Sequence, residues 1–492
     1  MARIGLDLDR SLGPVDRRIF GGFIEHLGRC IYGGVFEPGS PLSDERGFRT
    51  DVLDKARALR MPLLRWPGGN FVSNYHWTDG VGPMEHRPRR LELAWQAEEP
   101  NTFGTDEFIE YCRALGTEPY ICLNMGTGTL REALAWLEYC NGAGNTYWAN
   151  QRRTNGHADP FNVRYWGLGN EMWGDWQVGH LTADEYVARA RSWANALRRA
   201  DRGIELVGCG RDGWSDWDRS VVDGLIRYVD YHSIHIYTGS PDYWTNVLSP
   251  HQAERCVRIC EALIERARQI QEVERPIGIA YDEWNVWYRE RGERSGLEEQ
   301  YTLADALAVA TFLNIFVRSS RSVRIANLAQ LVNVIAPIFT SPEGLFVQTI
   351  FHPLRLFSEH VQSVALDPTV VCESITHADP SGGARPHRIG DLGPFKLLDV
   401  AATRDASGRR VTLTVVNRSP DAAVPVVVTA GRPLASGGAV VHLVHGPSPE
   451  ARNSFAEPDL VSVRTDAVPI ESGELELTFP PHSFACVELT LA

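Results

Sequence analysis

The 492-residue chain has little that would tie it to a membrane, a nucleic acid or a secretory route. It contains no run of eighteen apolar residues, so we predict no membrane-spanning helix. Its formal net charge is -13 and it has no long basic run, which argues against nucleic acid or an anionic membrane as a partner. The N-terminus lacks the long apolar core of a signal peptide, and we therefore expect a cytoplasmic location.

Sequence patterns that hold metals and cofactors are also missing. The nine cysteines are scattered and none forms the Cys-x-x-Cys pair of a zinc site, so buried free thiols are the better interpretation. Gly208-Cys-Gly-Arg-Asp-Gly213 has the glycine spacing of a dinucleotide site. It follows the fifth predicted strand, however, and precedes Trp214-Ser-Asp-Trp217 instead of an apolar helix. We expect no dinucleotide, no other organic cofactor and no metal.

What the chain does contain is a series of eight apolar segments, most of them followed by helix-compatible sequence. Eight such units in about 340 residues predict an α/β fold, a (β/α)₈ TIM barrel over residues 16–365. From residue 366 short alternating segments at 411–416, 424–428, 439–443 and 474–478 predict a C-terminal antiparallel β-sandwich. Residues 3–9 have no helix partner and are assigned to this second domain, 1–15 plus 366–492. The eight barrel strands are predicted at 20–24, 63–66, 119–123, 164–168, 204–208, 231–237, 277–283 and 324–330.

Polar side chains fall repeatedly where these predicted barrel strands end. In a barrel of this kind the carboxyl ends of the strands share one face, which carries the active site. A scatter of polar residues by chance would not place so many there. The residues in question are Glu25, Asn70, Asn124, Glu171, His235, Tyr237 and Glu283.

Two of these side chains, Glu171 and Glu283, end strands four and seven. Those strands lie on opposite sides of a barrel mouth, so the two carboxyl groups can face each other across a gap the size of a sugar ring. Such a pair cleaves glycosidic bonds, and a separation of about 5–5.5 Å is typical of retaining enzymes. Asn170 offers a donor to a substrate hydroxyl, which favours Glu171 as acid/base. Tyr237 is placed to keep Glu283 ionised, which favours it as nucleophile.

Glu25 and Asn70 end neighbouring strands one and two. A carboxylate accepts hydrogen bonds and an amide both donates and accepts, so together they can hold vicinal sugar hydroxyls. The alternative is that Glu25 forms an ion pair with Arg29 or Arg65.

Eight segments together resemble the α-L-arabinofuranosidases of glycoside hydrolase family 51. The resemblance implies a clan A barrel with a C-terminal β-sandwich, an intracellular hexamer, and a retaining double displacement with Glu171 as acid/base and Glu283 as nucleophile. It further implies furanose contacts by Glu25, Asn70, Asn170, Tyr237 and Gln348. The segments are Phe23-Ile-Glu-His-Leu-Gly28, Tyr32-Gly-Gly34, Arg65-Trp-Pro-Gly-Gly-Asn70, Arg87-Pro-Arg-Arg90, Ala94-Trp95, Gly167-Leu-Gly-Asn-Glu171, Asp282-Glu-Trp-Asn285 and Ala329-Gln-Leu-Val-Asn-Val334.

One segment departs from this family pattern. Many relatives have Asp-Gly after the Met that follows the acid/base, whereas this chain has Trp173-Gly-Asp-Trp176 on the leaving-group side. The leading hypothesis is an exo-acting enzyme that removes terminal α-L-arabinofuranosyl units from oligosaccharides without a cofactor. Two alternatives on the same frame are a β-D-galactofuranosidase and an endo-glucanase. A non-catalytic carbohydrate-binding protein is the alternative of a different class.

Overall fold

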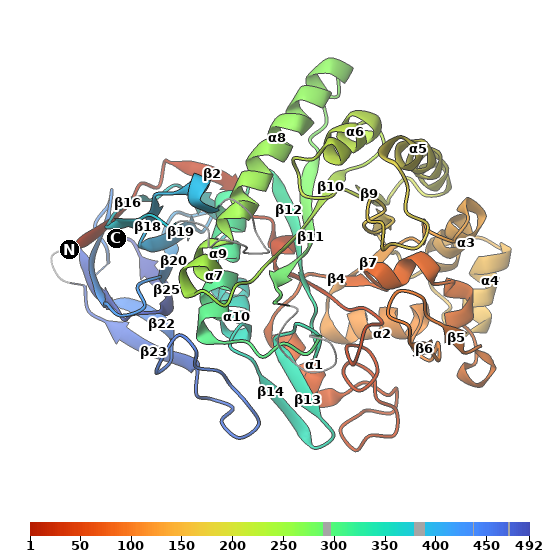
Figure 1. Cartoon of the computed structure of the whole chain (residues 1–492), viewed down its shortest axis with the longest axis horizontal. Coiled ribbons are helices and arrows are strands. Elements are labelled where there is room, and N and C mark those ends of the chain that lie inside the picture. The colour runs from red at the N-terminus through yellow and green to blue at the C-terminus, as the bar shows by residue number, and fades with distance from the viewer. Residues whose placement is uncertain (289–296, 378–388, 436, 471–472) are drawn as a thin grey trace.

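The computed structural model describes residues 1–288, 297–377, 389–435, 437–470 and 473–492. Within these ranges, eight parallel strands close into a barrel, which confirms the predicted (β/α)₈ fold (Figure 1). Each predicted strand is present, and Leu63–Trp66 has the predicted bounds. The strands are β3 (Gly21–Phe23), β4 (Leu63–Trp66), β7 (Glu118–Cys122), β8 (Tyr165–Leu168), β9 (Glu205–Gly208), β10 (Tyr231–Thr238), β11 (Gly278–Val286) and β12 (Val323–Ala329).

Several of the helices begin at a residue whose side chain caps the first turn. At the start of α5 (Ala183–Ala200) the Thr182 side chain accepts from the backbone amide of Glu185, and the Glu185 carboxylate accepts from the backbone amide of Thr182. The two bonds form a capping box. Helix α9 (Leu303–Arg318) is buried along almost its whole length, because it packs between barrel strand β11 and three strands of the second domain, β19 (Leu398–Arg404), β20 (Arg410–Asn417) and β25 (Ser483–Thr490). The helices are α1 (Thr50–Ala58), α2 (Thr105–Leu115), α3 (Leu130–Asn141), α4 (Tyr147–Thr154), α5 (Ala183–Ala200), α6 (Asp216–Leu225), α7 (Tyr243–Leu248), α8 (His251–Gln271), α9 (Leu303–Arg318) and α10 (Phe351–His360).

Two further sheets form the C-terminal β-sandwich. A four-stranded sheet has the order β16-β1-β21-β24, and a seven-stranded sheet has the order β2-β15-β19-β20-β25-β22-β23. Apolar side chains from both sheets share one core. The strands are β1 (Ala2–Leu6), β2 (Ser11–Pro14), β15 (Val364–Leu366), β16 (Thr369–Val371), β19 (Leu398–Arg404), β20 (Arg410–Asn417), β21 (Val424–Ala430), β22 (Ala439–His445), β23 (Ser462–Val468), β24 (Leu475–Phe479) and β25 (Ser483–Thr490).

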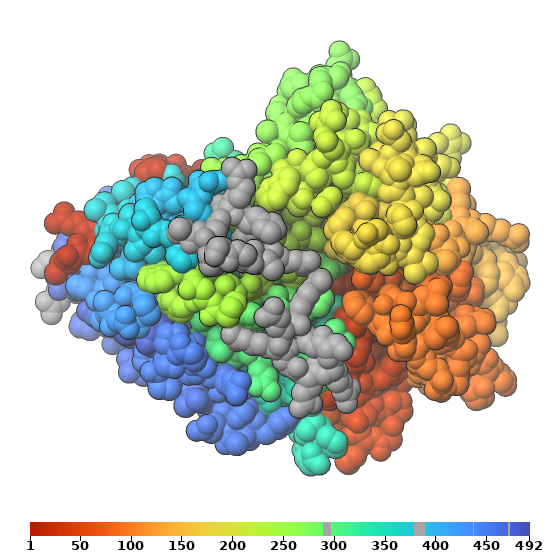
Figure 2. Space-filling model, in the orientation of Figure 1, coloured from red at the N-terminus to blue at the C-terminus, as the bar shows by residue number. Residues whose placement is uncertain are grey.

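The first strand of the chain lies in this sandwich. Strand β1 pairs antiparallel with β16 but parallel with β21, with Arg3 opposite Val427. The sandwich is therefore not wholly antiparallel, because the connection from β1 to β21 runs through the entire barrel. Figure 1 shows the two chain ends together at the sandwich, and Figure 2 shows the first half of the barrel at the opposite end of the molecule.

A buried ion cluster connects the sandwich to the barrel helices. Asp399 on β19 is 2.9 Å from the Arg418 guanidinium and 3.1 Å from that of Arg318 on α9. Asn314, one turn earlier on α9, also donates to Asp399 at 2.7 Å. Burial raises the pKa of Asp399, but the two guanidinium groups outweigh burial and hold it well below its usual range.

The long connection between β4 and α2 has more local structure than its sequence indicates. Short 3-10 helices span Asn70–Asn74, Trp77–Gly80 and Met84–His86, and a hairpin pairs β5 (Arg90–Leu91) with β6 (Glu98–Glu99). The first two of these short helices and the hairpin line a cavity of about 580 Å³.

All nine cysteines lie in the described ranges and are free, and eight of them are buried. No helix in those ranges combines the length and apolarity needed to span a membrane.

Candidate active site

The two acids singled out in the sequence lie on different kinds of backbone. Glu171 follows β8 after a sharp turn, in which Gly169 has a φ of 80° and Glu171 itself a φ of 43°. Residues other than glycine rarely adopt such a φ, and local strain of this kind clusters at functional sites. Glu283, in contrast, does not end its strand as expected. Strand β11 continues to Val286, because β10 also extends and keeps pairing with it.

His235 connects the two acids. In the register of β10 and β11 it lies opposite Glu283. Its Nδ1 is 3.1 Å from Oε1 of Glu171 and 3.5 Å from Oε2 of Glu283. One carboxylate oxygen of each acid and one imidazole nitrogen all lie within 4.8 Å of one another. The barrel therefore brings the two acids together at one point.

Arg65 on β4 orients two of the predicted site residues. It is buried, and its Nη1 donates to Oε2 of Glu283 at 2.9 Å. Its Nη2 donates to Oδ1 of Asn170 at 2.5 Å, which fixes the orientation of that amide. The Nδ2 of Asn170 is then a buried donor that finds no hydrogen-bond partner among the described residues.

The buried carboxylate of Asp282 contacts His235 and affects its protonation state. Its carboxylate accepts from Tyr120 at 2.7 Å and from Ser233 at 2.5 Å, and one oxygen is 3.3 Å from His235 Nε2. Burial raises the pKa of Asp282, but the charges of Arg65 and His235 hold it well below its usual range. Burial lowers the pKa of His235, but Glu283, Asp282 and Glu171 outweigh this and raise it to about 10. His235 is therefore a cation at neutral pH.

The charge on His235 determines the state of Glu171. Burial raises the pKa of Glu171, whereas the hydrogen bond and charge of His235 lower it, and the Trp176 indole at 3.3 Å lowers it further. The net pKa is below the usual value. The proton shared by this pair is therefore held on His235 Nδ1, 3.1 Å from Oε1 of Glu171.

Glu25 is a buried carboxylate held by three donors. It accepts from the Phe71 amide at 3.1 Å, the Trp95 indole at 3.1 Å and the Gln330 amide at 2.8 Å. Gly69 allows this placement, since a Cβ there would lie 2.3 Å from a Glu25 oxygen. Burial and the nearby Glu283 charge raise the pKa of Glu25 to about 7.

The alternative interpretation of Glu25 as an ion-pair partner is wrong. Arg29 pairs instead with Glu298 at 2.7 Å, and Arg65 pairs with Glu283.

The remaining predicted substrate contacts, Tyr237, Asn70 and Gln348, differ in how many hydrogen bonds their side chains already make. Tyr237 donates its hydroxyl to Oε1 of Glu283 at 2.7 Å. The Asn70 side chain is half-buried and makes no hydrogen bond within the described part of the chain. Gln348 is already engaged: its amide donates to the carbonyls of Glu299 and Ala336, and its oxygen accepts from the Tyr301 amide. To contact a sugar it would have to exchange one of these bonds.

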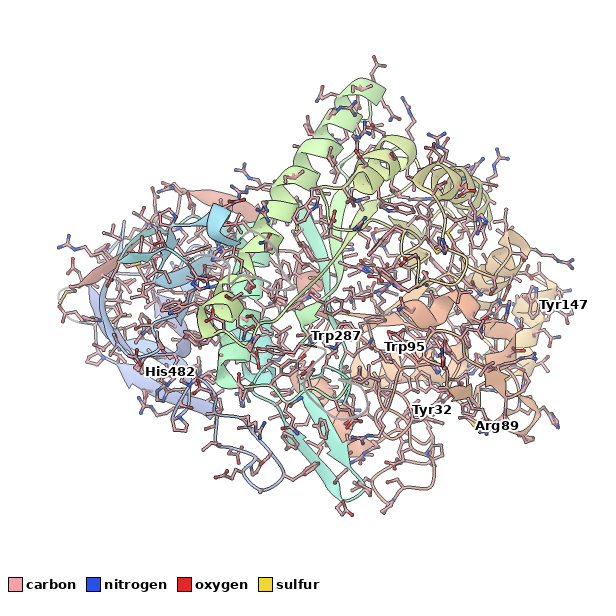
Figure 3. All side chains as sticks on the ribbon, in the orientation of Figure 1. Tyr32, Arg89, Trp95, Tyr147, Trp287 and His482 are labelled. Carbon is pink, nitrogen blue, oxygen red and sulfur yellow. The ribbon has the colours of Figure 1, made fainter. Side chains whose placement is uncertain are left out.

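Aromatic side chains surround the acids. Trp287 packs edge-on against Tyr237 with ring centroids 5.2 Å apart. In Figure 3 Trp287 and Trp95 lie toward the middle of the view, whereas Tyr147 lies at its outer edge. On the Glu171 side, Trp176 is 55% exposed and packs edge-on against Trp173 at 5.0 Å. Trp173 is held in place by Arg211, whose guanidinium lies 4.6 Å over its ring.

Sequence reasoning gave no role to Asp282, Gln330 or Trp95 and considered Arg65 only as a possible ion-pair partner of Glu25, although all four contact predicted site residues. All four lie inside the segments that carry the family resemblance, and Trp95 among them lies in the long connection between β4 and α2. Position within those segments was therefore the available signal.

The glycine-rich segment 208–213 is not organised to bind phosphate. The Asp218 carboxylate accepts from the backbone amides of Arg211, Gly213 and Ser215. A phosphate-binding loop needs such amides free for its ligand. Asp218 is also 2.8 Å from His232.

Glu171, His235 and Glu283 each present one atom of the kind that binds metal ions. A ligating imidazole must be neutral, whereas His235 holds a proton because its pKa is about 10. Arg65 already supplies a positive charge at 2.9 Å from Glu283. This group of side chains is therefore poorly suited to a cation.

Three known proteins that this chain is similar to are all named as α-L-arabinofuranosidases. The family description "Alpha-L-arabinofuranosidase 1 domain" matches residues 55–255, and "Alpha-L-arabinofuranosidase C-terminal domain" matches residues 282–483. The chain is 43% identical over 498 residues to alpha-L-arabinofuranosidase C of Emericella nidulans, covering 98% of this chain and 96% of that protein. It is 40% identical over 391 residues to the intracellular exo-alpha-(1->5)-L-arabinofuranosidase of Acetivibrio thermocellus, covering 75% and 78%. The structure of the GH51 alpha-L-arabinofuranosidase from Thermotoga petrophila matches with a TM-score of 0.91 at 42% identity, covering 99% and 100%.

Proposed function

The chain belongs to the α-L-arabinofuranosidases of glycoside hydrolase family 51, and we propose that it releases terminal, non-reducing α-L-arabinofuranosyl residues from arabino-oligosaccharides with retention of configuration. The observation that carries the proposal is the meeting of Glu171 and Glu283 at His235, with one oxygen of each acid within 4.8 Å of the other. A retaining pair lies about 5–5.5 Å apart, whereas an inverting pair needs about 6.5–9.5 Å for a water molecule.

In the first step the Glu283 carboxylate attacks the anomeric carbon of the arabinofuranose. The bond from that carbon to the leaving oxygen breaks, and a covalent glycosyl-enzyme forms on Glu283. Tyr237 and Arg65 donate to the two oxygens of Glu283 and so fix its direction of attack. Orientation of this kind is a large part of the advantage of an enzyme site.

The leaving oxygen needs a proton, which Glu171 delivers. Because the substrate-free pair keeps its proton on His235, the proton passes along the 3.1 Å hydrogen bond to Glu171 and then to the leaving group. In the second step water attacks the anomeric carbon and the bond from that carbon to Glu283 breaks, while Glu171 accepts a proton from the water. Glu171 then passes this proton back to His235 Nδ1, which restores the starting state. Arabinose leaves with its original configuration, and Glu283 is again a carboxylate.

Four side chains are proposed to hold the furanose. The unpartnered Nδ2 of Asn170 donates to a hydroxyl next to the reacting carbon, and the free amide of Asn70 and the carboxylate of Glu25 bind hydroxyls farther along the ring. Tyr237 contacts the ring oxygen side through its hydroxyl. A buried donor without a partner costs free energy, so a hydroxyl that satisfies Asn170 adds to binding.

The leaving group is proposed to lie against Trp176. This ring is more than half exposed and donates to Glu171, so a sugar attached at the leaving oxygen would pass over it. Trp173 packs edge-on against the Trp176 ring and supports it. The Acetivibrio thermocellus relative is named an exo-acting enzyme, which supports the proposed exo mode of attack.

Two enzymatic alternatives share this frame. β-D-Galactofuranosides have the same ring stereochemistry at the contacts named above, and an endo-glucanase would use the same pair of acids. A panel of chromogenic furanosides and pyranosides distinguishes them: we expect the arabinofuranoside to give the highest kcat/KM. A carbohydrate-binding protein without activity would bind arabinofuranosides and turn over none of them.

The test of the mechanism separates the two acids. Glu283→Gln removes the nucleophile, and activity should be lost for every leaving group. Glu171→Gln keeps the nucleophile but lacks the proton donor, so activated aryl substrates should still form the glycosyl-enzyme. Azide should then restore turnover in Glu171→Gln and release an arabinosyl azide of retained configuration. Azide rescue of Glu283→Gln with inversion would reverse the two roles.

Three further properties are proposed. The pairing of β1 with β16 and β21 supports dividing the chain into a barrel, 16–365, and a sandwich, 1–15 plus 366–492. A cytoplasmic location is supported by the relative named intracellular and by the free cysteines. The assembly is proposed to be a homo-oligomer, six copies by family resemblance, which light scattering of the purified protein tests directly.

A further inference from the structure

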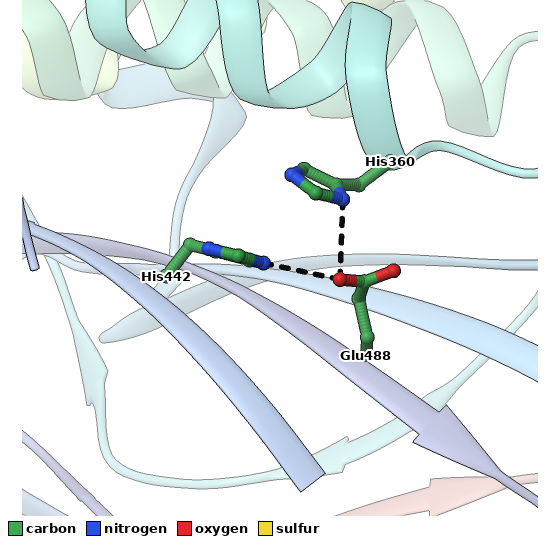
Figure 4. Close-up of side chains that lie close together, drawn as sticks. All are labelled: His360, His442 and Glu488. Carbon is green, nitrogen blue, oxygen red and sulfur yellow. Dashed lines mark hydrogen bonds and ion pairs between the residues drawn. The ribbon is translucent and has the colours of Figure 1, made fainter. Parts of the chain in front are cut away.

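A second group of metal-binding side chain types lies far from the acids, between α10 and the seven-stranded sheet. His360 is the last residue of α10, His442 lies on β22 and Glu488 on β25. In the register of these two strands Val440 is opposite Glu488, so His442 is one step diagonal from Glu488 on the same face. Figure 4 shows the three side chains converging between the helix and the sheet.

The distances among them match those of a coordination site. His360 Nδ1 is 3.2 Å and His442 Nε2 is 3.1 Å from the same oxygen of Glu488, and all three atoms lie within 4.8 Å of one another. A tetrahedral zinc site with bonds of about 2.0–2.1 Å has ligand atoms about 3.3 Å apart. The two imidazole rings are stacked, with centroids 4.3 Å apart and planes 23° apart, so one ring must turn about its Cβ–Cγ bond for both lone pairs to meet at an ion.

One of the two imidazoles is oriented by a partner on its other ring nitrogen. Thr465 Oγ1 is 2.9 Å from Nδ1 of His442, which is within hydrogen-bond distance. Partners on the ring nitrogen that faces away from a metal are the usual way in which ligating histidines are oriented.

Access and flexibility are also suitable. The Glu488 side chain is 39% exposed, so its carboxylate can move to make room for an ion. The same exposure leaves a fourth position for water. Two imidazoles and one carboxylate suit zinc and its transition-metal neighbours and are a poor set for Ca²⁺ or Mg²⁺, which prefer oxygen ligands.

We propose that His360, His442 and Glu488 form a binding site for a divalent transition-metal ion of the zinc class, which connects barrel helix α10 to strands β22 and β25. The site is independent of the glycosidase proposal, because none of its residues contacts Glu171 or Glu283. Its role is structural. An ion bound by both elements stabilises their contact and leaves the reaction chemistry unchanged.

The test measures metal binding directly. The full-length protein is treated with a chelator, desalted and titrated with Co²⁺ by visible absorption and with Zn²⁺ by calorimetry. The wild type should bind one more ion per chain than His442→Ala, with tetrahedral Co²⁺ bands, and Zn²⁺ should raise its Tm. Loss of an outer partner of a ligand costs about 10- to 100-fold in affinity, so loss of a ligand should cost at least about 100-fold.

Matched variants keep the outcome interpretable. His445→Ala changes an exposed histidine on the same strand and should bind as the wild type does. Glu488→Gln is nearly the same shape as the native residue, so it retains the fold if His442→Ala does not, and it should also lose the site. Equal Zn²⁺ stoichiometry and affinity in the wild type, His442→Ala and Glu488→Gln overturns the proposal. Loss of binding in His445→Ala alone would place the ion elsewhere.

Discussion

The hydroxyl of Tyr237 provides the sharpest test of how Glu283 is held. Tyr237→Phe removes one oxygen atom, and with it the 2.7 Å hydrogen bond to Oε1 of Glu283. The ring keeps its edge-on contact with Trp287 at 5.2 Å, so the wall of the site should remain in place. Arg65 still donates to the other oxygen, so Glu283 keeps one of its two supports.

The size of the effect follows from the type of bond. A hydrogen bond to a charged group contributes about 1.5–3 kcal/mol, and each 1.36 kcal/mol is a tenfold change in rate. If the bond is made in full only when Glu283 is aligned for attack, kcat/KM should fall about 10- to 150-fold. The Tm should change little, because a single hydroxyl is removed and no cavity is created.

The assay is the hydrolysis of 4-nitrophenyl α-L-arabinofuranoside, with Tyr75→Phe as the matched control. Tyr75 is also a buried tyrosine, but its hydroxyl has no hydrogen-bond partner among the described residues. The same chemical change should therefore alter kcat/KM by less than about twofold, because no hydrogen bond is lost. The reasoning is refuted if Tyr237→Phe stays within about threefold of the wild type, or if Tyr75→Phe is impaired to the same extent.

Three other changes test separate parts of the structure. Trp176→Ala removes the proposed platform for the leaving group, so KM for arabinobiose should rise several-fold while inhibition by free arabinose, which needs only the furanose contacts, should be unchanged. KM should fall as pH rises through about 7, because the pKa of Glu25 is about 7 and its ionised form accepts sugar hydroxyls; Glu25→Gln should remove this inflection from the KM–pH profile. Burial lowers the pKa of His352 to about 4, so the unfolded chain takes up a proton below about pH 6.5 while the folded chain does not. Stability should therefore fall by up to about 3 kcal/mol between pH 6.5 and 4, and urea denaturation of His352→Gln should show a smaller loss.

The barrel was predictable because its strands and caps are local signals. All eight strands were found, and the Thr182–Glu185 capping box that predicts the start of α5 is present. Strand β25 was missed because it lies between β20 and β22 and beneath α9 and α10, so it is almost fully buried and lacks alternation. Strand β19 was missed as well. It contains Asp399, whose burial depends on arginines that lie far away in the sequence.

The site was predictable as a set of residue types but not as a network. Glu171 and Glu283 are recognisable from the strands they follow or lie in, because barrel topology alone brings those positions to one face. Tyr237 was predicted as a partner of Glu283 and donates to it. The charged partner of Glu283 was not recognisable, since Arg65 lies 218 residues away in the sequence. The bridging position of His235 depends on the register shift between Ser233 and His235 in the pairing of β10 with β11, which no local pattern reveals.

The parallel pairing of β1 with β21 has a consequence for the chain while it is being synthesised. Arg3 lies opposite Val427, so about 420 residues are synthesised between the two partners. At about 5–20 residues per second, the first strand spends about 20–80 s after its synthesis without the neighbour that completes its sheet. Ile4 and Leu6, which are buried in the folded protein, are exposed to solvent during that interval. A newly made chain is therefore most open to chaperones, and to pairing with another copy, through the strand that was made first.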